Sequence, residues 1–133
     1  MITKELFEEI ALAGGATLDA VYHEGQRIGN VNNMKYASGY AVSIKGYELV
    51  THKLTIELLD AYIEMYKEFL ENNPAARVGV WFNLKDGKIY LDISKVYQNI
   101  YNALDEAAAN KQKAIYDFAR GVSINRLTME VMK

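Results

Sequence analysis

The sequence predicts a single α+β domain, in which a small mixed or antiparallel sheet of about five strands packs with two main helices and a short N-terminal helix. Three observations predict this fold. The 133 residues are 50% apolar and 24% charged, as expected of a folded domain with one core. Segments of alternating apolar residues occur together with segments of helical periodicity. No repeat or linker divides the chain, so we expect residues 1–133 to form one domain.

The N-terminal part of the chain predicts one helix and two strands. Thr3 is suited to cap a short helix, and Gly14 and Gly15 are suited to end it. Residues 16–22 have a strand-like pattern. A loop rich in glycine and asparagine follows, and from Gly39 a second strand carries a large apolar residue at every second position.

Two longer segments predict the main helices. Residues 54–72 place apolar side chains at helical spacing, and this helix must end before Pro74, because proline disfavours helical geometry in the residue that precedes it. Residues 96–111 form the second helix, whose alanines allow close packing on a sheet. A last strand is expected at 113–118, and residues 125–133 form an extra helix or an arm.

A hairpin over residues 77–94 is the strongest local signal, and we expect it at the centre of the sheet. Asp86 and Gly87 join its two strands, and this dipeptide accepts the positive φ angles of a tight two-residue turn. The resulting register puts six apolar side chains on one face, as the pairs Leu84 with Ile89, Phe82 with Leu91, and Val80 with Ile93. The opposite face then holds the pairs Asn83 with Tyr90, Trp81 with Asp92, and Gly79 with Ser94.

This second face is both aromatic and polar, which leaves two interpretations open. Trp81 beside the Asp92 carboxylate could stack on a base or a sugar and bond its edge. It could equally pack beneath a helix or against a second subunit, which is the more common role for a large aromatic residue.

The residues predict no catalytic or metal site. The chain has no cysteine, which excludes thiolate nucleophiles, disulfides and zinc fingers. His23 and His52 lie in predicted loops, and we expect both to face solvent. Asp92 and Asp117 make only a possible carboxylate pair on neighbouring strands, a pattern that is usually structural. We therefore expect no enzyme activity, no metal and no cofactor.

The charge and the apolar pattern of the sequence limit which binding partners and which cellular compartment we expect for the protein. A formal net charge of -2 disfavours general nucleic-acid binding but allows a small anionic ligand. Acidic residues near the N-terminus and the lack of a long apolar run predict neither export nor membrane insertion, so we expect a cytoplasmic protein. Four residues in loops, at a helix end or in the tail could meet a phosphate or have ordinary capping and solvent roles: Arg27, Asn110, Lys113 and Arg126.

Segments spread over most of the chain resemble a widespread family of small phage and prophage proteins. These segments are Gly14-Gly15-Ala16-Thr17-Leu18-Asp19, Ser38-Gly39-Tyr40-Ala41-Val42-Ser43, Gly79-Val80-Trp81, Tyr90-Leu91-Asp92-Ile93-Ser94 and Gln112-Lys113-Ala114-Ile115-Tyr116-Asp117. The loop over residues 23–37 is longer than this family's pattern. The chain looks like the anti-Thoeris phage sponges, which are small α+β subunits that form homo-oligomers.

The resemblance implies a phage-encoded anti-defence protein. Such a protein binds and sequesters a nucleotide-derived immune signal, of cyclic ADP-ribose or cyclic oligonucleotide type, without cleaving it. A dimer-based homo-oligomer, up to a hexamer, in the host cytoplasm is implied, with ligand where subunits meet. The implied candidates are Trp81, Phe82 and Tyr40 for stacking, Asp92 beside them, and Arg27, Asn110, Lys113 and Arg126 for phosphate or ribose. Phe82 fits least well, because the hairpin register turns it toward the core.

Two other functions stay open. The chain could be a phage inhibitor that binds a host or defence protein directly, as anti-CRISPR and anti-restriction proteins do. It could also be an enzyme that degrades an immune signal with Asp92 and Asp117.

Overall fold

The computed structural model describes residues 2–132. Over this range the chain is α+β, as predicted, and has four helices, an antiparallel sheet of eight strands and a second sheet of two strands. The helices are α1 (Lys4–Ala13), α2 (Ile56–Met65), α3 (Lys67–Asn72) and α4 (Ile100–Ala109). The strands are β1 (Gly15–Asp19), β2 (Tyr22–His23), β3 (Gln26–Arg27), β4 (Asn32–Asn33), β5 (Tyr40–Ser43), β6 (Leu49–Thr51), β7 (Ala76–Asn83), β8 (Lys88–Tyr97), β9 (Ala114–Asp117) and β10 (Val122–Asn125).

The eight-stranded sheet has the order β10-β9-β5-β8-β7-β1-β4, and β6 also pairs with β8. The estimate of about five strands was too low because three short strands were not predicted: β4, β6 and β10, which have two, three and four residues. The predicted central hairpin is confirmed, since β7 and β8 lie in the middle of this order.

The register of the hairpin differs from the prediction by two residues. Asn83, not Lys85, lies opposite Lys88, so the turn has four residues. The Asn83 side chain helps to hold this longer turn, because its Oδ1 atom accepts a hydrogen bond from the Lys85 N–H at 2.9 Å. Because side chains alternate between the two faces of a sheet, a register shift of two residues leaves the strand side chains on their predicted faces. It does move Leu84 out of the predicted core and leaves that residue 97% exposed.

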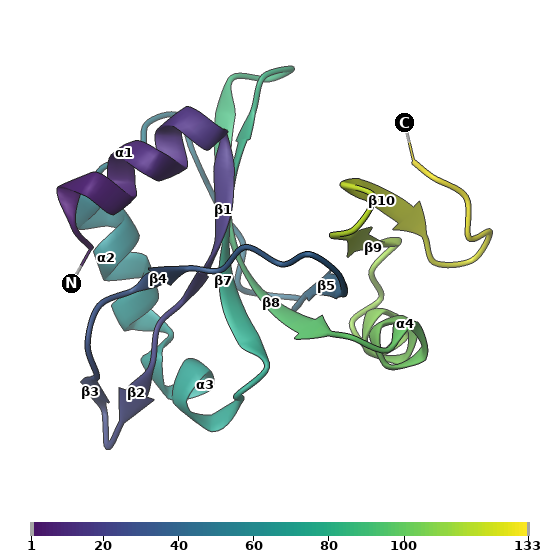
Figure 1. Cartoon of the computed structure of the whole chain (residues 1–133), viewed down its shortest axis with the longest axis horizontal. Helices are drawn as coiled ribbons and strands as arrows, with labels where there is room; N and C mark the ends of the chain where they lie inside the picture. The colour runs from purple at the N-terminus through teal and green to yellow at the C-terminus, as the bar shows by residue number, and fades with distance from the viewer. Residues whose placement is uncertain (1, 133) are drawn as a thin grey trace.

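Alternation along β7 and β8 gives the sheet two unlike faces. The covered face carries the buried apolar residues Val78, Val80, Leu91 and Ile93. These residues share one core with side chains of α1, α2 and α3. In Figure 1 those three helices lie together on one side of β7 and β8.

Helix α4 covers the same face at the other end of the sheet. Val42 of β5 lies opposite Lys95 of β8 and so shares the covered face. It is buried together with Ala103 and Ala107 of α4 in a second apolar cluster. The helices therefore leave the opposite face of the sheet, here called the open face, uncovered by any helix of residues 2–132. Figure 1 shows β9 and β10 standing apart from β7 across this face.

The boundaries of the two main predicted helices needed correction, whereas the C-terminal segment takes one of its two predicted forms. The segment 54–72 is two helices that meet at Tyr66, whose φ and ψ of -107° and 22° are not helical. Helix α4 begins at Ile100, not at 96, because the preceding residues extend β8 and pair with β5. The C-terminal segment is an arm: Val131 bridges to Ile124 of β10.

The predicted signals at the ends of α1 are confirmed. The Thr3 hydroxyl accepts a hydrogen bond from the Leu6 N–H at 3.1 Å, and Gly14 ends the helix with a φ of 79°. A side chain would strain this left-handed backbone, so glycine suits the position. None of the helices within residues 2–132 is long and apolar enough to cross a membrane.

The hairpin register can be tested by truncating two leucines that the sequence prediction placed on the same face. Leu91→Ala should lower the free energy of unfolding by about 2–5 kcal/mol, because Leu91 is fully buried. Leu84→Ala should change it by less than about 0.5 kcal/mol, because Leu84 lies in the turn. Urea denaturation measures both. Equal losses for the two variants would favour the two-residue turn instead.

Candidate functional site

The open face of the sheet is concave and forms a groove of about 1260 Å³. Strands β1, β7, β8, β5, β9 and β10 all contribute side chains to it, so it spans most of the sheet. Ligand pockets for small molecules usually measure about 300–1,000 Å³. The groove therefore has room for a ligand of nucleotide size or larger.

Asp92 lines the groove from strand β8. The Ser43 hydroxyl donates a hydrogen bond to its Oδ2 atom at 2.6 Å, and the Ser94 hydroxyl donates to its Oδ1 atom at 3.2 Å. Among residues 2–132, no lysine or arginine forms an ion pair with this carboxylate. A carboxylate has about four acceptor positions. The two hydroxyls orient the group and leave acceptor positions on each oxygen.

Gly79 makes room for this carboxylate. It lies directly opposite Asp92 in the β7–β8 ladder. A Cβ atom at Gly79 would lie 2.1 Å from Asp92 Oδ1, far inside the contact distance. The Asp92 carboxylate thus packs directly against the backbone of residue 79. Any residue other than glycine at this position would displace the carboxylate.

An aromatic pair lies next to the carboxylate on the same face. Trp81 and Tyr90 are opposite each other, with ring centroids 5.5 Å apart and planes inclined at 35°. Trp81 is 57% exposed, which is unusual for the largest apolar side chain. The Tyr90 hydroxyl donates a hydrogen bond to Asp86 in the turn, which raises the pKa of Tyr90 and lowers the pKa of Asp86. This bond fixes one ring and leaves the tryptophan ring open to a flat ligand.

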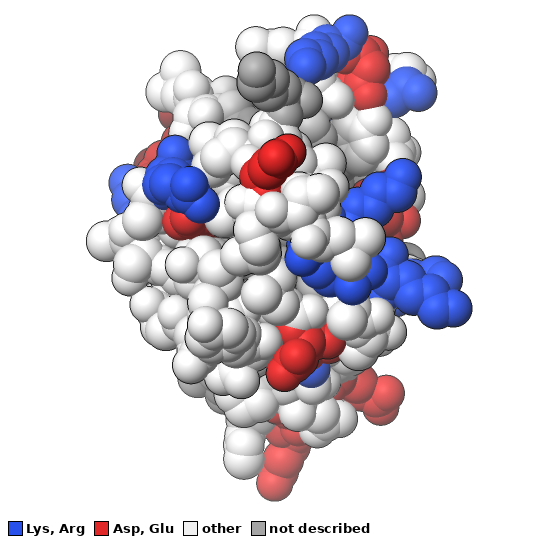
Figure 2. Space-filling view, turned by 90° about the vertical axis from the view of Figure 1, so that its right-hand side faces the viewer, with Lys and Arg blue, Asp and Glu red and all other residues white. Residues whose placement is uncertain are grey.

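Charges of opposite sign line different parts of the groove. Glu48 lines it next to Leu49, the β6 residue that pairs with Leu91, and so lies near Asp92. Lys111 and Lys113 line it where the chain passes from α4 into β9. Neither lysine makes an ion pair within the described part of the chain. Figure 2 shows basic side chains gathered at mid-height toward one side of the molecule, next to a largely uncharged surface.

Three of the eight predicted site residues face the groove: Trp81, Asp92 and Lys113. Two others lie on the covered face. Phe82 packs against the main core, and Tyr40 packs against the cluster under α4. Their positions follow from strand alternation, since each is one residue away from a groove-facing position.

Arg27 lies in β3, on the small second sheet. Its guanidinium bonds Asp60 at 2.5 Å and Glu64 at 3.4 Å, and its Nε atom donates to the Tyr22 hydroxyl at 3.0 Å. These bonds tie the β2–β3 hairpin to α2. The Tyr22 hydrogen bond contributes most to lowering the pKa of Glu64. Arg27 is thus occupied by structural contacts away from the groove.

Asn110 and Arg126 also make structural contacts. Asn110 ends α4, and its side-chain amide donates to the Glu106 carboxylate at 2.7 Å. The Arg126 Nε donates to the Gln112 carbonyl at 2.9 Å, which fastens the C-terminal arm to the start of β9. Both residues adjoin Lys111 or Gln112, which line the groove, but do not line it themselves.

The supposed carboxylate pair of Asp92 and Asp117 is not formed. Asp117 lies opposite Tyr40 and therefore on the covered face, whereas Asp92 is on the open face. Asp117 instead accepts a hydrogen bond from Arg120 Nε at 2.9 Å, which lowers its pKa. The degradation mechanism based on this pair has no geometric basis.

The sequence reasoning placed Ser94 and Gly79 on the same face as Asp92 but did not find the contact with Ser43. Ser43 and Asp92 are 49 residues apart, so no local pattern connects them. Gly79 did carry a signal: a glycine inside an otherwise apolar strand often marks the close approach of another group.

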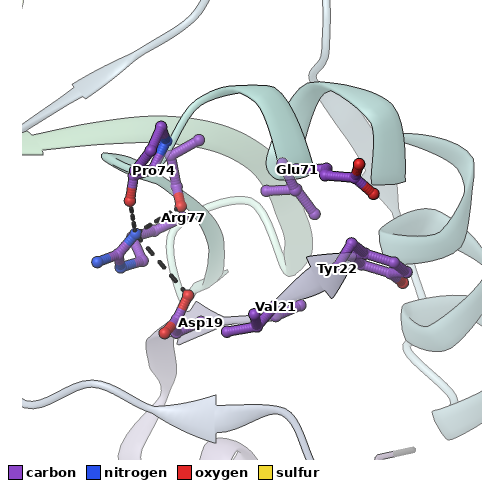
Figure 3. A pocket seen from close by; sticks show the side chains of 9 residues that line it. Asp19, Val21, Tyr22, Glu71, Pro74 and Arg77 are labelled. Atoms are coloured by element: carbon purple, nitrogen blue, oxygen red, sulfur yellow. Dashed lines mark hydrogen bonds and ion pairs between the residues drawn. The ribbon is translucent and has the colours of Figure 1, made fainter. Parts of the chain in front are cut away.

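A second, smaller cavity of about 260 Å³ lies between β1 and the end of α3. Figure 3 shows Arg77 directed toward the Pro74 carbonyl and Asp19. The Pro74 carbonyl accepts from Arg77 at 2.7 Å, and Glu71 accepts from the Gly25 N–H at 2.8 Å. The charged groups of this cavity are already engaged in bonds between loops, so we assign it a structural role.

Comparison of the chain with models of protein families, with curated proteins and with solved structures found no match. The resemblance to phage sponges therefore rests on the sequence segments quoted above.

The contact between Gly79 and Asp92 can be tested by a double-mutant cycle. Gly79→Ala should lower the free energy of unfolding by about 1–3 kcal/mol, because the new methyl group displaces the carboxylate from its two hydroxyl donors. In the Asp92→Ala background the same change should cost little or stabilise, because alanine suits a strand better than glycine. Denaturant titration measures all four proteins. An equal cost in both backgrounds would show that something other than Asp92 requires the glycine.

Proposed function

We propose that the protein binds a nucleotide-derived small molecule in the groove and holds it without cleaving it. In the phage setting that the family resemblance implies, it sequesters a cyclic ADP-ribose or cyclic oligonucleotide immune signal. The observation that carries the proposal is the groove itself. It combines an exposed tryptophan, an oriented carboxylate and two lysines within one concave surface.

Each part of the groove suits one part of a nucleotide. The Trp81 ring offers a face on which a base can stack, a contact worth about 1–3 kcal/mol per base. Lys111 and Lys113 offer ammonium groups for phosphate. Both kinds of contact favour binding and require no nucleophile, which agrees with sequestration.

Retention of nucleotides by the purified chain tests the proposal. The chain is incubated with cyclic ADP-ribose and cyclic di- and trinucleotides, passed over a filter and then heat-denatured. Mass spectrometry should find at least one of them retained and released intact. Trp81→Ala should weaken retention about tenfold or more, because the stacking surface is lost. Tyr101→Ala is the matched control, since Tyr101 is 73% exposed on α4 and does not line the groove.

Two outcomes would contradict sequestration. Failure to retain any of these nucleotides would contradict the proposal that the protein binds them. Recovery of a nucleotide with altered mass would indicate an enzyme that degrades the signal.

Exposed apolar side chains support self-association as part of the proposal. Leu12 is 91% exposed and Leu84 is 97% exposed. Both lie at the end of the sheet where α1 leads into β1, because Gly15 of β1 pairs with Trp81 just before the β7–β8 turn. A second copy of the chain would remove this surface from water. Light scattering on the filtered sample should give a dimer or a larger assembly. A monomer would instead favour one-to-one binding of a host or defence protein.

A further inference from the structure

We infer that the Asp92 carboxylate in the groove selects a base with two adjacent N–H donors, that is, a guanine. This inference rests on the proposed function and narrows it to guanine-containing nucleotides. The observation behind it is an oriented, partly buried carboxylate beside an exposed tryptophan, in a groove that two lysines line on its β9 side.

The Asp92 carboxylate is built to accept hydrogen bonds from a ligand. Ser43 and Ser94 each donate one bond to a different oxygen, which fixes the plane of the group. Each oxygen keeps a free acceptor position. A ligand can form two parallel, charge-assisted N–H hydrogen bonds to one carboxylate. Its two donor nitrogens must then be about as far apart as the two carboxylate oxygens. Guanine presents such a pair at N1 and at its exocyclic amino group.

The residues around Asp92 favour a planar hydrogen-bond donor, such as a base, over a simple cation. Trp81 and Tyr90 occupy the row of the sheet next to Asp92, so a ring bonded to the carboxylate can extend over the indole. Glu48 lies near Asp92 and adds negative charge, which also favours hydrogen-bond donors. Lys111 and Lys113 line the same groove and would repel a polyamine or another polycation. A neutral base joined to a phosphate matches both the carboxylate and the lysines.

Adenine and hypoxanthine fit the Asp92 carboxylate less well than guanine does. Adenine has an acceptor at N1, which would face the carboxylate and repel it. Hypoxanthine keeps the N1 donor but has no exocyclic amino group, so it loses one charge-assisted bond. A hydrogen bond to a charged group contributes enough to change affinity about tenfold or more.

Calorimetry with three mononucleotides tests the inference without altering the protein. Guanosine 5′-monophosphate should bind about tenfold more tightly than inosine 5′-monophosphate, and adenosine 5′-monophosphate should bind more weakly still. Asp92→Asn should abolish the preference for guanosine over inosine, since the carboxamide has only one acceptor oxygen. Asp105→Asn, on the exposed side of α4, is the matched control and should keep the preference. Thermal melting checks that both variants are folded.

Failure of this inference is distinguishable from failure of the proposed function. Equal affinity for the three mononucleotides, or no binding of guanosine 5′-monophosphate, would overturn guanine selection. The proposed function would survive if Trp81-dependent retention of cyclic nucleotides still held. If the Asp92→Asn variant is unfolded, the ratio of guanosine to inosine affinity in the unaltered protein decides the question.

Discussion

The pairing of β7 with β8 is the constraint on which the rest of the structure depends. The ladder runs from Ala76 opposite Lys95 to Asn83 opposite Lys88. Other strands extend the sheet from both of its edges, and the helices pack on one of its faces. Because side chains alternate along each strand, this one register assigns every residue of the hairpin to a face. One face is covered by helices and forms the core, and the other remains open. The groove exists because all the helices within residues 2–132 pack on the same face.

Local signals in the sequence were sufficient for much of this arrangement. Thr3 and Gly14 marked the ends of α1, and strand alternation put Trp81 and Asp92 on the same face. Turn length was missed, because the Asn83 side chain bonds the turn backbone and holds four residues where Asp86 and Gly87 suggested two. Short strands such as β4 and β6 were also missed, since they are fixed by pairing with distant strands and not by local propensity.

The candidate site was predicted only in part, for a physical reason. Trp81 and Asp92 come from one hairpin, whereas Lys113 and Ser43, which donates to the carboxylate, come from distant parts of the chain. Gly79 and Ser43 act through contacts across strands, which depend on exact register and on the path of β5. Arginine and asparagine residues that looked suitable for phosphate instead tie loops and helix ends together. Polar residues in loops have many structural partners, so residue type alone does not identify a ligand contact.

The groove as a nucleotide-binding surface is the central claim, and the chain contains a natural reporter for it. Trp81 is the only tryptophan, and its ring lies exposed on the groove. The most direct test of the claim is a fluorescence titration. A nucleotide that the protein retains is added stepwise, and the emission of Trp81 is measured. Stacking of a base on the indole should quench the emission and shift it to shorter wavelength, with the affinity that calorimetry gives. Emission that stays unchanged while calorimetry reports saturation would place the ligand elsewhere and contradict the claim.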